Sequence, residues 1–272
     1  MKPLSLRLTH RELLQRGDLT LCWRARDAVL DRPVFVKVLN PALAQDAEIR
    51  ARFEREAKAV ARLDHPNLVR IYEYGEDPDE GMYMILEWVE GTTLAKQITN
   101  GKRFTGEELL ALARELLSGL AVLHSVGILH RDLKPENVLV TPPSPPAKAG
   151  GNRYKITDFS LAALRDAPKL THHEAIVGTP AYMAPEQAAG GQPTERSDLF
   201  SVGIVLYEAA TGKNPMIGET MLDTLRKIRE SDVSLTHSAI IALPPSGRSL
   251  LEQLLRKSPQ DRPASAHDAL SL

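Results

Sequence analysis

The stretch H-R-D-L-K-P-E-N at residues 130–137 decides how the rest of this 272-residue chain is interpreted. It places Asp132 and Asn137 on one short segment, and D-F-S follows at 158–160 and A-P-E at 184–186. A carboxylate can take the proton of a hydroxyl group, whereas an amide oxygen and a second carboxylate are ligands that Mg²⁺ accepts. These residue types in this order indicate phosphoryl transfer.

The quoted stretch resembles the catalytic loop of protein kinases, and the resemblance extends over nearly the whole chain. It implies an α+β, two-lobed protein-kinase-like fold. The N-lobe would hold an antiparallel sheet with one main helix, and the C-lobe would be mostly helical. We expect a single protein kinase domain over residues 1–272. Its N-lobe would span about 1–86, its hinge about 87–91 and its C-lobe about 92–272.

The resemblance assigns the reaction to four side chains. Asp132 would be the catalytic base that orients the substrate hydroxyl, and Lys134 would steady the transferring phosphate. Asn137 and Asp158 would ligate Mg²⁺, with Mn²⁺ as an alternative ion. ATP is then the expected phosphate donor.

Residues 32–39 are rich in β-branched side chains and alternate with period two, which predicts a strand with Phe35 and Lys37 on one face. A helical pattern follows, and in it Glu56 lies on an apolar stripe formed by Ile49, Phe53, Val60 and Leu63. A lone carboxylate is costly to bury, so Lys37 is its expected partner unless Glu56 stays solvated at the stripe edge. The resemblance favours the pair, with Lys37 on the α- and β-phosphates of ATP.

Residues 82–89 read as another strand that leads into a linker. By resemblance, this linker is the hinge between the lobes. Leu86 would be the gatekeeper, and the backbone of Glu87, Trp88 and Val89 would bind adenine.

The glycine-rich loop departs from the family pattern. Its three glycine positions fall on Gln15, Gly17 and Thr20, so one glycine remains to let backbone N–H groups approach phosphate. Asp18 adds a repelling charge, and Cys22 replaces the valine that covers adenine. We therefore expect a weaker phosphate cradle.

Two further departures affect the nucleotide site. Phe35 stands where kinases have a small residue over adenine, and it shares a strand face with Lys37. Its ring could stack on a tilted adenine, fill the adenine pocket or swing aside as a core aromatic, and the sequence leaves these alternatives open. Ser160 replaces the glycine of D-F-G and restricts the backbone there.

Two motifs favour Ser/Thr acceptors on proteins. L-K-P-E at 133–136 resembles Ser/Thr kinases rather than tyrosine kinases. G-T-P-A-Y-M-A-P-E at 178–186 separates protein kinases from small-molecule kinases. By resemblance, Thr179 would hydrogen-bond Asp132 and Lys134 beside the acceptor hydroxyl.

The segment between the second aspartate and A-P-E carries the expected regulation. Thr171 is the predicted activating phosphosite, with Arg131 as the partner of its phosphate. Two structural roles follow from the resemblance. Asp198 would hydrogen-bond the catalytic-loop backbone, and Arg262 would pair with Glu186. Independently of the resemblance, Asp198 could cap the start of its helix, alone or together with that role.

Helix signals surround these motifs. Thr105 and Glu108 form a capping-box pattern before a leucine stripe that runs to residue 123. Residues 198–212 are apolar all round and end in glycine, which predicts a buried central helix. The Pro- and Gly-rich residues 141–151 are expected to form an exposed, mobile insert between two strands.

The composition of the chain mainly argues against certain partners and locations. The formal net charge is −1, with 34 basic and 35 acidic residues, so no global field favours nucleic acid. The single Cys22 cannot form an internal disulfide. Residues 199–210 form the most apolar run, but they are too short to span a bilayer. Residues 1–10 lack a signal peptide's apolar run. We expect a cytoplasmic protein without a membrane segment or nucleic-acid partner.

Residues 52–57 and Gln187 resemble bacterial eukaryotic-like serine/threonine protein kinases most closely. Two hypotheses follow. The first is an active ATP-dependent Ser/Thr protein kinase that phosphorylates proteins, itself included. The alternative is a pseudokinase, a scaffold or signalling module with weak or no nucleotide binding, because Phe35, Ser160 and the altered loop all affect the nucleotide site.

Overall fold

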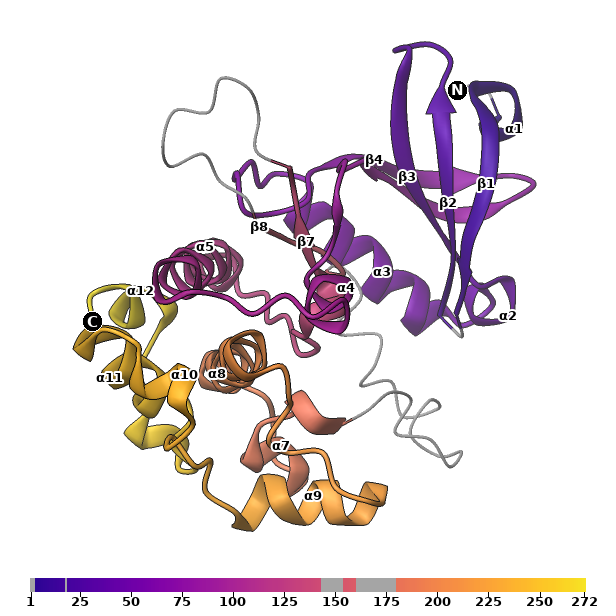
Figure 1. Cartoon of the computed structure of the whole chain (residues 1–272). Helices are drawn as coiled ribbons and strands as arrows, with labels where there is room; N and C mark the ends of the chain where they lie inside the picture. Colours follow the sequence, from indigo (N-terminus) through magenta and orange to yellow (C-terminus); the bar gives the residue numbers. More distant parts are fainter. Residues whose placement is uncertain (1–2, 18, 143–153, 160–179) are drawn as a thin grey trace.

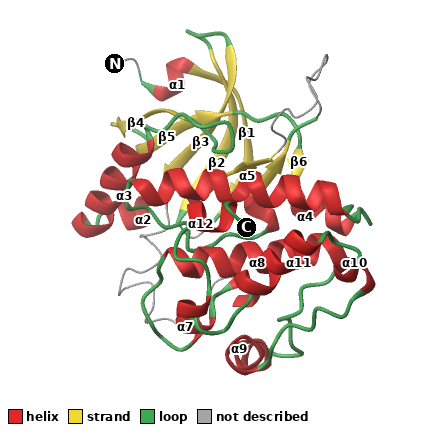
Figure 2. Ribbon diagram, turned by 90° about the vertical axis from the view of Figure 1, so that its left-hand side faces the viewer, coloured by secondary structure: helices red, strands yellow, loops and turns green. Residues whose placement is uncertain are grey.

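The computed structural model describes residues 3–17, 19–142, 154–159 and 180–272. Figure 1 shows a strand-rich N-lobe above a helical C-lobe, and Figure 2 shows the same division from the side. The predicted α+β, two-lobed architecture is confirmed.

The N-lobe is built on a five-stranded antiparallel sheet with strand order β1-β2-β3-β5-β4. Its strands are β1 (Leu8–Arg16), β2 (Thr20–Asp27), β3 (Arg32–Leu39), β4 (Ile71–Asp77) and β5 (Gly81–Glu87). Three helices accompany them, namely α1 (Leu4–Arg7), α2 (Pro41–Ala44) and α3 (Ala47–Val60).

Local sequence explains β3 and α3. Strand β3 has the predicted bounds, and its alternation buries Val34 and Val36 in a small core on one face of the sheet. Helix α3 begins where the Asp46 carboxylate accepts two backbone N–H groups of the first turn. It buries Phe53 and other apolar residues against the main core. The predicted stripe was one turn too long, since Leu63 follows the end of the helix.

The C-lobe is mainly helical, with a small antiparallel sheet of order β6-β7-β8. Its strands are β6 (Thr92–Thr93), β7 (Val138–Val140) and β8 (Tyr154–Ile156). Its α-helices are α4 (Leu94–Thr99), α5 (Gly106–Ser125), α7 (Pro185–Ala188), α8 (Glu195–Thr211), α9 (Met221–Glu230), α10 (Ser238–Ile241), α11 (Pro245–Leu254) and α12 (Ala266–Leu270). Short 3₁₀ turns are η1 (Pro135–Asn137), η3 (Pro180–Tyr182) and η4 (Pro259–Asp261).

Helices α5 and α8 form the centre of the C-lobe, and Figure 2 shows both of them below the N-lobe sheet. The capping box at Thr105 and Glu108 starts α5 as predicted. Helix α8 is buried along most of its length and ends at Gly212, whose φ of 77° suits a residue without a side chain. It begins at Glu195, with Thr194 as N-cap, so the interpretation of Asp198 as a simple cap is wrong.

A second connection between the lobes lies outside the hinge. The segment that leads from α3 to β4 pairs with β8: Val69 N–H donates to Ile156 O at 2.9 Å, and Ile156 N–H donates to Asn67 O at 2.8 Å. The Asn67 side chain donates to Glu115 of α5 and to the Tyr154 carbonyl, both at 2.9 Å. Residues 67–69, which precede the hinge in the sequence, are thus hydrogen-bonded to the C-lobe.

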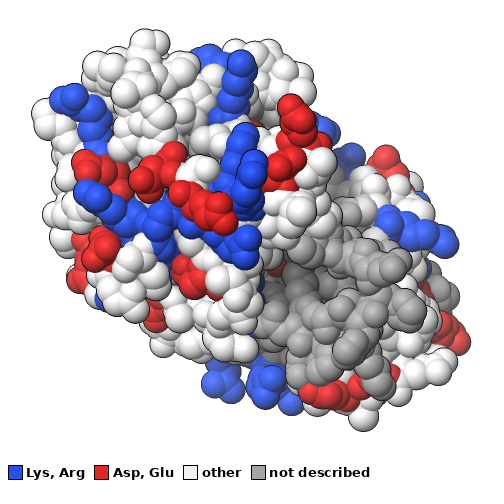
Figure 3. Space-filling view, turned by 90° about the horizontal axis from the view of Figure 1, so that it is seen from below, with Lys and Arg blue, Asp and Glu red and all other residues white. Residues whose placement is uncertain are grey.

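Surface charge shows no single sign on the face seen from below, where Lys and Arg side chains lie among Asp and Glu (Figure 3). Within the described ranges, none of the helices combines the length and the apolar character that crossing a membrane requires. The predicted insert at 141–151 falls mostly on residues 143–153, which lie outside the described part.

Candidate active site

The catalytic-loop backbone is held by Asp198. Its two carboxylate oxygens accept the backbone N–H groups of His130 and Arg131, each at 2.8 Å, and His124 Nε2 lies 2.9 Å from one of them. Asp198 is 1% exposed. Arg131 has a φ of 63°, a conformation that non-glycine residues keep only when their surroundings impose it. The buried carboxylate supplies that constraint from α8.

The side chains of the catalytic loop converge on Asp132. Lys134 Nζ lies 2.9 Å from Asp132 Oδ2. Asn137 Nδ2 donates to the Asp132 carbonyl at 2.8 Å and to Oδ2 at 3.2 Å. The carboxylate therefore has one orientation, fixed from within its own loop.

His130 connects this loop to the strand that leads to Asp158. Its Nε2 lies 2.9 Å from the Thr157 carbonyl, which can only accept, so this nitrogen carries the proton. Its ring meets Phe159 edge-on, with centroids 6.5 Å apart. Burial lowers the pKa of His130, against the raising effect of Asp198. A neutral imidazole thus ties the two segments together at neutral pH.

Lys37 of β3 reaches the C-lobe. It is 2% exposed, and its ammonium group forms an ion pair with the Asp158 carboxylate. Asp158 has a φ of 69°, so both Arg131 and Asp158 hold left-handed backbone at this site. The Glu56 side chain lies outside what the structure describes, so the Lys37–Glu56 pair stays a prediction.

Asn137 and Asp158 fit the proposed metal role by their donor atoms. Because Asp132 fixes the amide nitrogen of Asn137, Oδ1 is the atom of that side chain that could ligate a cation. The Asp158 carboxylate already forms an ion pair with a cation, the Lys37 ammonium group. Amide and carboxylate oxygens are hard ligands that suit Mg²⁺.

One face of the N-lobe sheet, called here the Lys37 face, carries Cys22, Arg24, Phe35 and Lys37. Cys22 pairs with Lys37 and Arg24 pairs with Phe35 across β2 and β3, and paired residues project to the same side. Lys37 Nζ lies 5.8 Å from the Phe35 ring centroid, so the predicted shared face is confirmed. Burial raises the pKa of the Cys22 thiol, which favours its neutral form.

The β1–β2 turn keeps one glycine. Gly17 N–H donates to Thr20 O at 2.9 Å, and the Thr20 hydroxyl lies 3.7 Å from Cys22 Sγ. Thr20 stands at one of the family's glycine positions, and its backbone carbonyl closes the turn. Asp18 lies outside the described residues.

The hinge residues lie at the end of β5, which stops at Glu87, two residues earlier than predicted. Leu86 is buried and pairs with Phe35. Val89 packs partly buried against the main core. The Glu87 side chain turns toward β8 and forms an ion pair with Lys155 at 2.9 Å. Nothing in the sequence around Lys155 signalled this contact, because it depends on how β8 meets the hinge.

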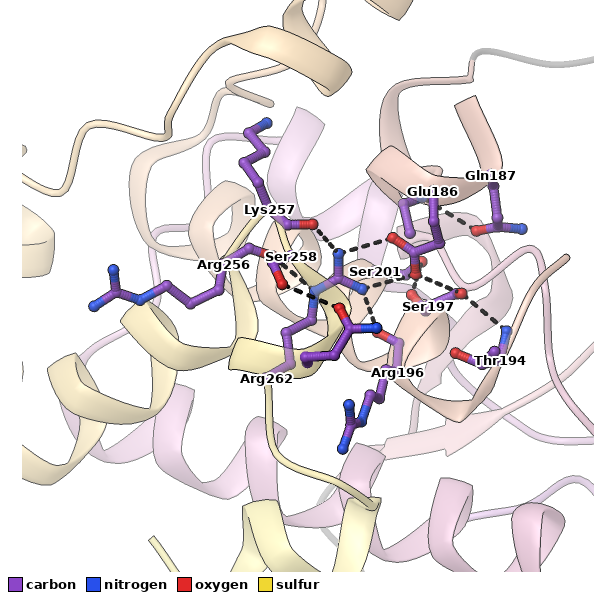
Figure 4. Close-up of polar contacts among 12 residues, drawn as sticks. Glu186, Gln187, Thr194, Arg196, Ser197, Ser201, Arg256, Lys257, Ser258 and Arg262 are labelled. Carbon is purple, nitrogen blue, oxygen red and sulfur yellow. Dashed lines mark hydrogen bonds and ion pairs between the residues drawn. The ribbon is translucent and has the colours of Figure 1, made fainter. Parts of the chain in front are cut away.

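Glu186, the glutamate of A-P-E, is held in the C-lobe by an ion pair and hydrogen bonds (Figure 4). Arg262, whose side chain is fully buried, binds both Glu186 oxygens at 2.8 Å, and Ser197 Oγ donates to one of them at 2.7 Å. Arg262 also donates to the carbonyls of Arg196, Arg256 and Lys257. Burial alone would raise the pKa of Glu186, but these hydrogen bonds outweigh it and the pKa is lowered.

Sequence reasoning missed Ser197, although its place three residues after Thr194 is a helix-start signal; its hydroxyl accepts the Thr194 N–H at 2.9 Å. Three predicted residues, Thr171, Thr179 and Ser160, lie outside the described part of the chain. Their assigned roles stay predictions.

Comparisons with known proteins agree with this geometry. The protein kinase domain model matches residues 8–271. Serine/threonine-protein kinase pkn3 of Myxococcus xanthus is 34% identical, and the match covers 97% of this chain and 49% of that protein. PrkC of Bacillus subtilis is 34% identical over 98% of this chain and 40% of its own length. The chain thus spans about half the length of these curated relatives.

A solved structure of Rad53 residues 1–466 in complex with AMP-PNP superposes with a TM-score of 0.77. It is 25% identical, and the match covers 97% of this chain and 63% of that one. The similarity in sequence and in structure spans both lobes. On this evidence, the chain belongs to the protein kinase domain family.

Proposed function

We propose that this protein transfers the γ-phosphoryl group of ATP to Ser or Thr hydroxyls of proteins, including its own. The observation that carries the proposal is the orientation of Asp132, which Lys134 and Asn137 fix within a loop held by Asp198. A base held in one orientation before substrate arrives loses little free energy to reorganisation.

Each side chain has a defined task in this reaction. Asp132 accepts the proton of the substrate hydroxyl as the hydroxyl oxygen bonds to the γ-phosphorus, while the bond from that phosphorus to the β–γ bridging oxygen breaks and ADP leaves. Lys134, 2.9 Å from that carboxylate, lies where it can stabilise charge on the phosphoryl oxygens. Lys37 binds the α- and β-phosphates. Asn137 and Asp158 would hold Mg²⁺, or Mn²⁺ in its place, and the bound ion would neutralise phosphate charge.

The acceptor class rests on the motif and on the relatives. Lys134 follows the catalytic base by two residues, a pattern that favours Ser/Thr acceptors. Relatives such as pkn3 and PrkC are named serine/threonine-protein kinases. The pseudokinase alternative rests on departures in the nucleotide site, and the names of the relatives reported above give it no support.

Autophosphorylation would act on Thr171. Its phosphate would pair with Arg131, the neighbour of the catalytic base, and order the segment around it. Thr179 would sit beside the acceptor hydroxyl. If Thr171→Ala and wild type, both first treated with phosphatase and then given Mg-ATP, reach the same activity, this assignment fails. We also propose that the protein is cytoplasmic. The proposed N-lobe spans about residues 1–86, the hinge about 87–91 and the C-lobe about 92–272.

The decisive experiment is incubation with labelled ATP and Mg²⁺ or Mn²⁺, followed by mapping of the labelled residues. Asp132→Asn should reduce labelling by about 10²–10⁴-fold, the usual contribution of a positioned general base. Asp31→Asn is the matched control, because Asp31 is an exposed aspartate with 81% of its side chain accessible. Equal labelling of wild type and Asp132→Asn, or none on wild type, would overturn the proposal.

A further inference from the structure

Both tryptophans of this protein are stacked by an arginine, but on opposite faces of the N-lobe sheet. Arg24 Cζ lies 4.5 Å from the ring centroid of Trp88, and Arg11 Cζ lies 4.9 Å from that of Trp23. Trp23 packs against the small core that contains Val34 and Val36. The Arg11 stack therefore belongs to the face turned away from Lys37.

The Arg24 stack lies on the Lys37 face. Arg24 is directly opposite Phe35, and Phe35 is opposite Leu86 on the next strand. Trp88 comes two residues after Leu86, in the hinge. To meet, the Arg24 and Trp88 side chains must together span the width of β3, on the side where Phe35 projects. The stack thus borders the Phe35 ring at its hinge end.

The indole is held in this position from a second side. Trp88 Nε1 donates to Glu90 Oε1 at 2.8 Å, so both the ring face and the ring nitrogen of Trp88 are engaged. Glu90 and Arg24 are exposed, whereas Trp88 is half-buried. The contact joins β2, which follows the altered glycine loop, to the hinge backbone proposed to bind adenine.

We infer that Arg24 and Trp88 form a clasp across the hinge end of the adenine site, and that the nucleotide base must open it to reach the hinge. This inference rests on the proposed function. Arg24 is then a positioning residue that sets nucleotide affinity. An exposed cation–π contact contributes enough that its loss changes affinity about two- to fivefold.

The test uses the full chain and two readouts. In a Trp23→Phe background, Trp88 is the only tryptophan, so its fluorescence reports on the clasp during titration with Mg-ATP or Mg-ADP. Calorimetry gives the Mg-ATP affinity of the corresponding proteins that keep Trp23. Arg24→Ala removes the clasp. Arg11→Ala, made in the protein that keeps Trp23, is the matched control, because it removes the same kind of contact from the opposite face.

We expect Mg-ATP to change Trp88 emission when Arg24 is present and not in Arg24→Ala. Arg24→Ala should bind Mg-ATP two- to fivefold more tightly, whereas Arg11→Ala should match its parent. Affinity in Arg24→Ala that is unchanged or weaker, with nucleotide still bound by both proteins, would overturn the clasp alone. Absence of nucleotide binding in every variant would overturn the proposed function as well.

Discussion

The catalytic loop and the Lys37 face of the sheet are both parts of the proposed site. They differ in the kind of contact that holds their side chains. Around Asp132, partners within the loop and on α8 fix each named group at hydrogen-bond distance. On the Lys37 face, the Phe35 ring lies beside Lys37, and the Arg24 guanidinium group stacks on Trp88 of the hinge. From this difference we expect phosphoryl-transfer geometry and nucleotide affinity to depend on separate residues, so that each can be tested separately.

The largest expected effect concerns the support of the C-lobe. Arg262→Ala leaves the Glu186 carboxylate without its buried partner and should lower the free energy of unfolding by about 3–5 kcal/mol. Urea denaturation measures it. Arg256→Ala is the control, because Arg256 forms an exposed ion pair with Glu252 one helical turn away. A loss no greater than that of Arg256→Ala would contradict a structural role for the Glu186–Arg262 pair.

Glu186 also predicts a pH dependence. Its pKa in the folded protein is lowered from 4.5, so its stabilising effect is present above that value and is lost as pH falls through the folded pKa. Glu186→Gln should be less stable than wild type by roughly 1.5–3 kcal/mol at neutral pH. The gap should close in acid. A gap that widens below pH 4.5 would show that the sign is wrong.

Phe35→Ala tests the Lys37 face of the sheet. If the ring must be displaced by adenine, the strain of a well-packed aromatic costs about 1–3 kcal/mol, and the variant should bind Mg-ATP roughly ten- to hundredfold more tightly. Val36→Ala is the control, because it removes core volume from the opposite face of the same strand. Calorimetric titration decides. Weaker binding in folded Phe35→Ala would mean that the ring stacks productively on adenine.

The smallest expected effect is on the hinge. A double-mutant cycle with Lys155→Met and Glu87→Gln should give a coupling free energy of about 0.5–1 kcal/mol, since both side chains are largely shielded from solvent. The more exposed Arg50–Glu76 pair is the comparison and should couple less. Thermal unfolding of the four proteins of each cycle measures the two coupling free energies. Equal coupling in the two pairs would show that the hinge contact is an ordinary surface ion pair.

Local signals predicted β3, the start of α5 and the glycine stop of α8, because each depends on residues close in sequence. The contacts that bring Arg24 to Trp88 and Lys155 to Glu87 could not be predicted. They join segments 64 and 68 residues apart, and no local pattern encodes which of these side chains meet. The Asp198 and Arg262 contacts were expected from the family resemblance, not from periodicity.

The pairing of residues 67–69 with β8 has a consequence for cutting the chain. Cleavage within residues 87–91 would yield two pieces that stay hydrogen-bonded across the cut, because Asn67 and Val69 of the first piece pair with β8 of the second. The C-terminal fragment alone would leave Glu115 and the edge of β8 without these partners. Recovery of its fold would then require the N-terminal fragment in trans, with the 67–69 segment as the point where the pieces rejoin.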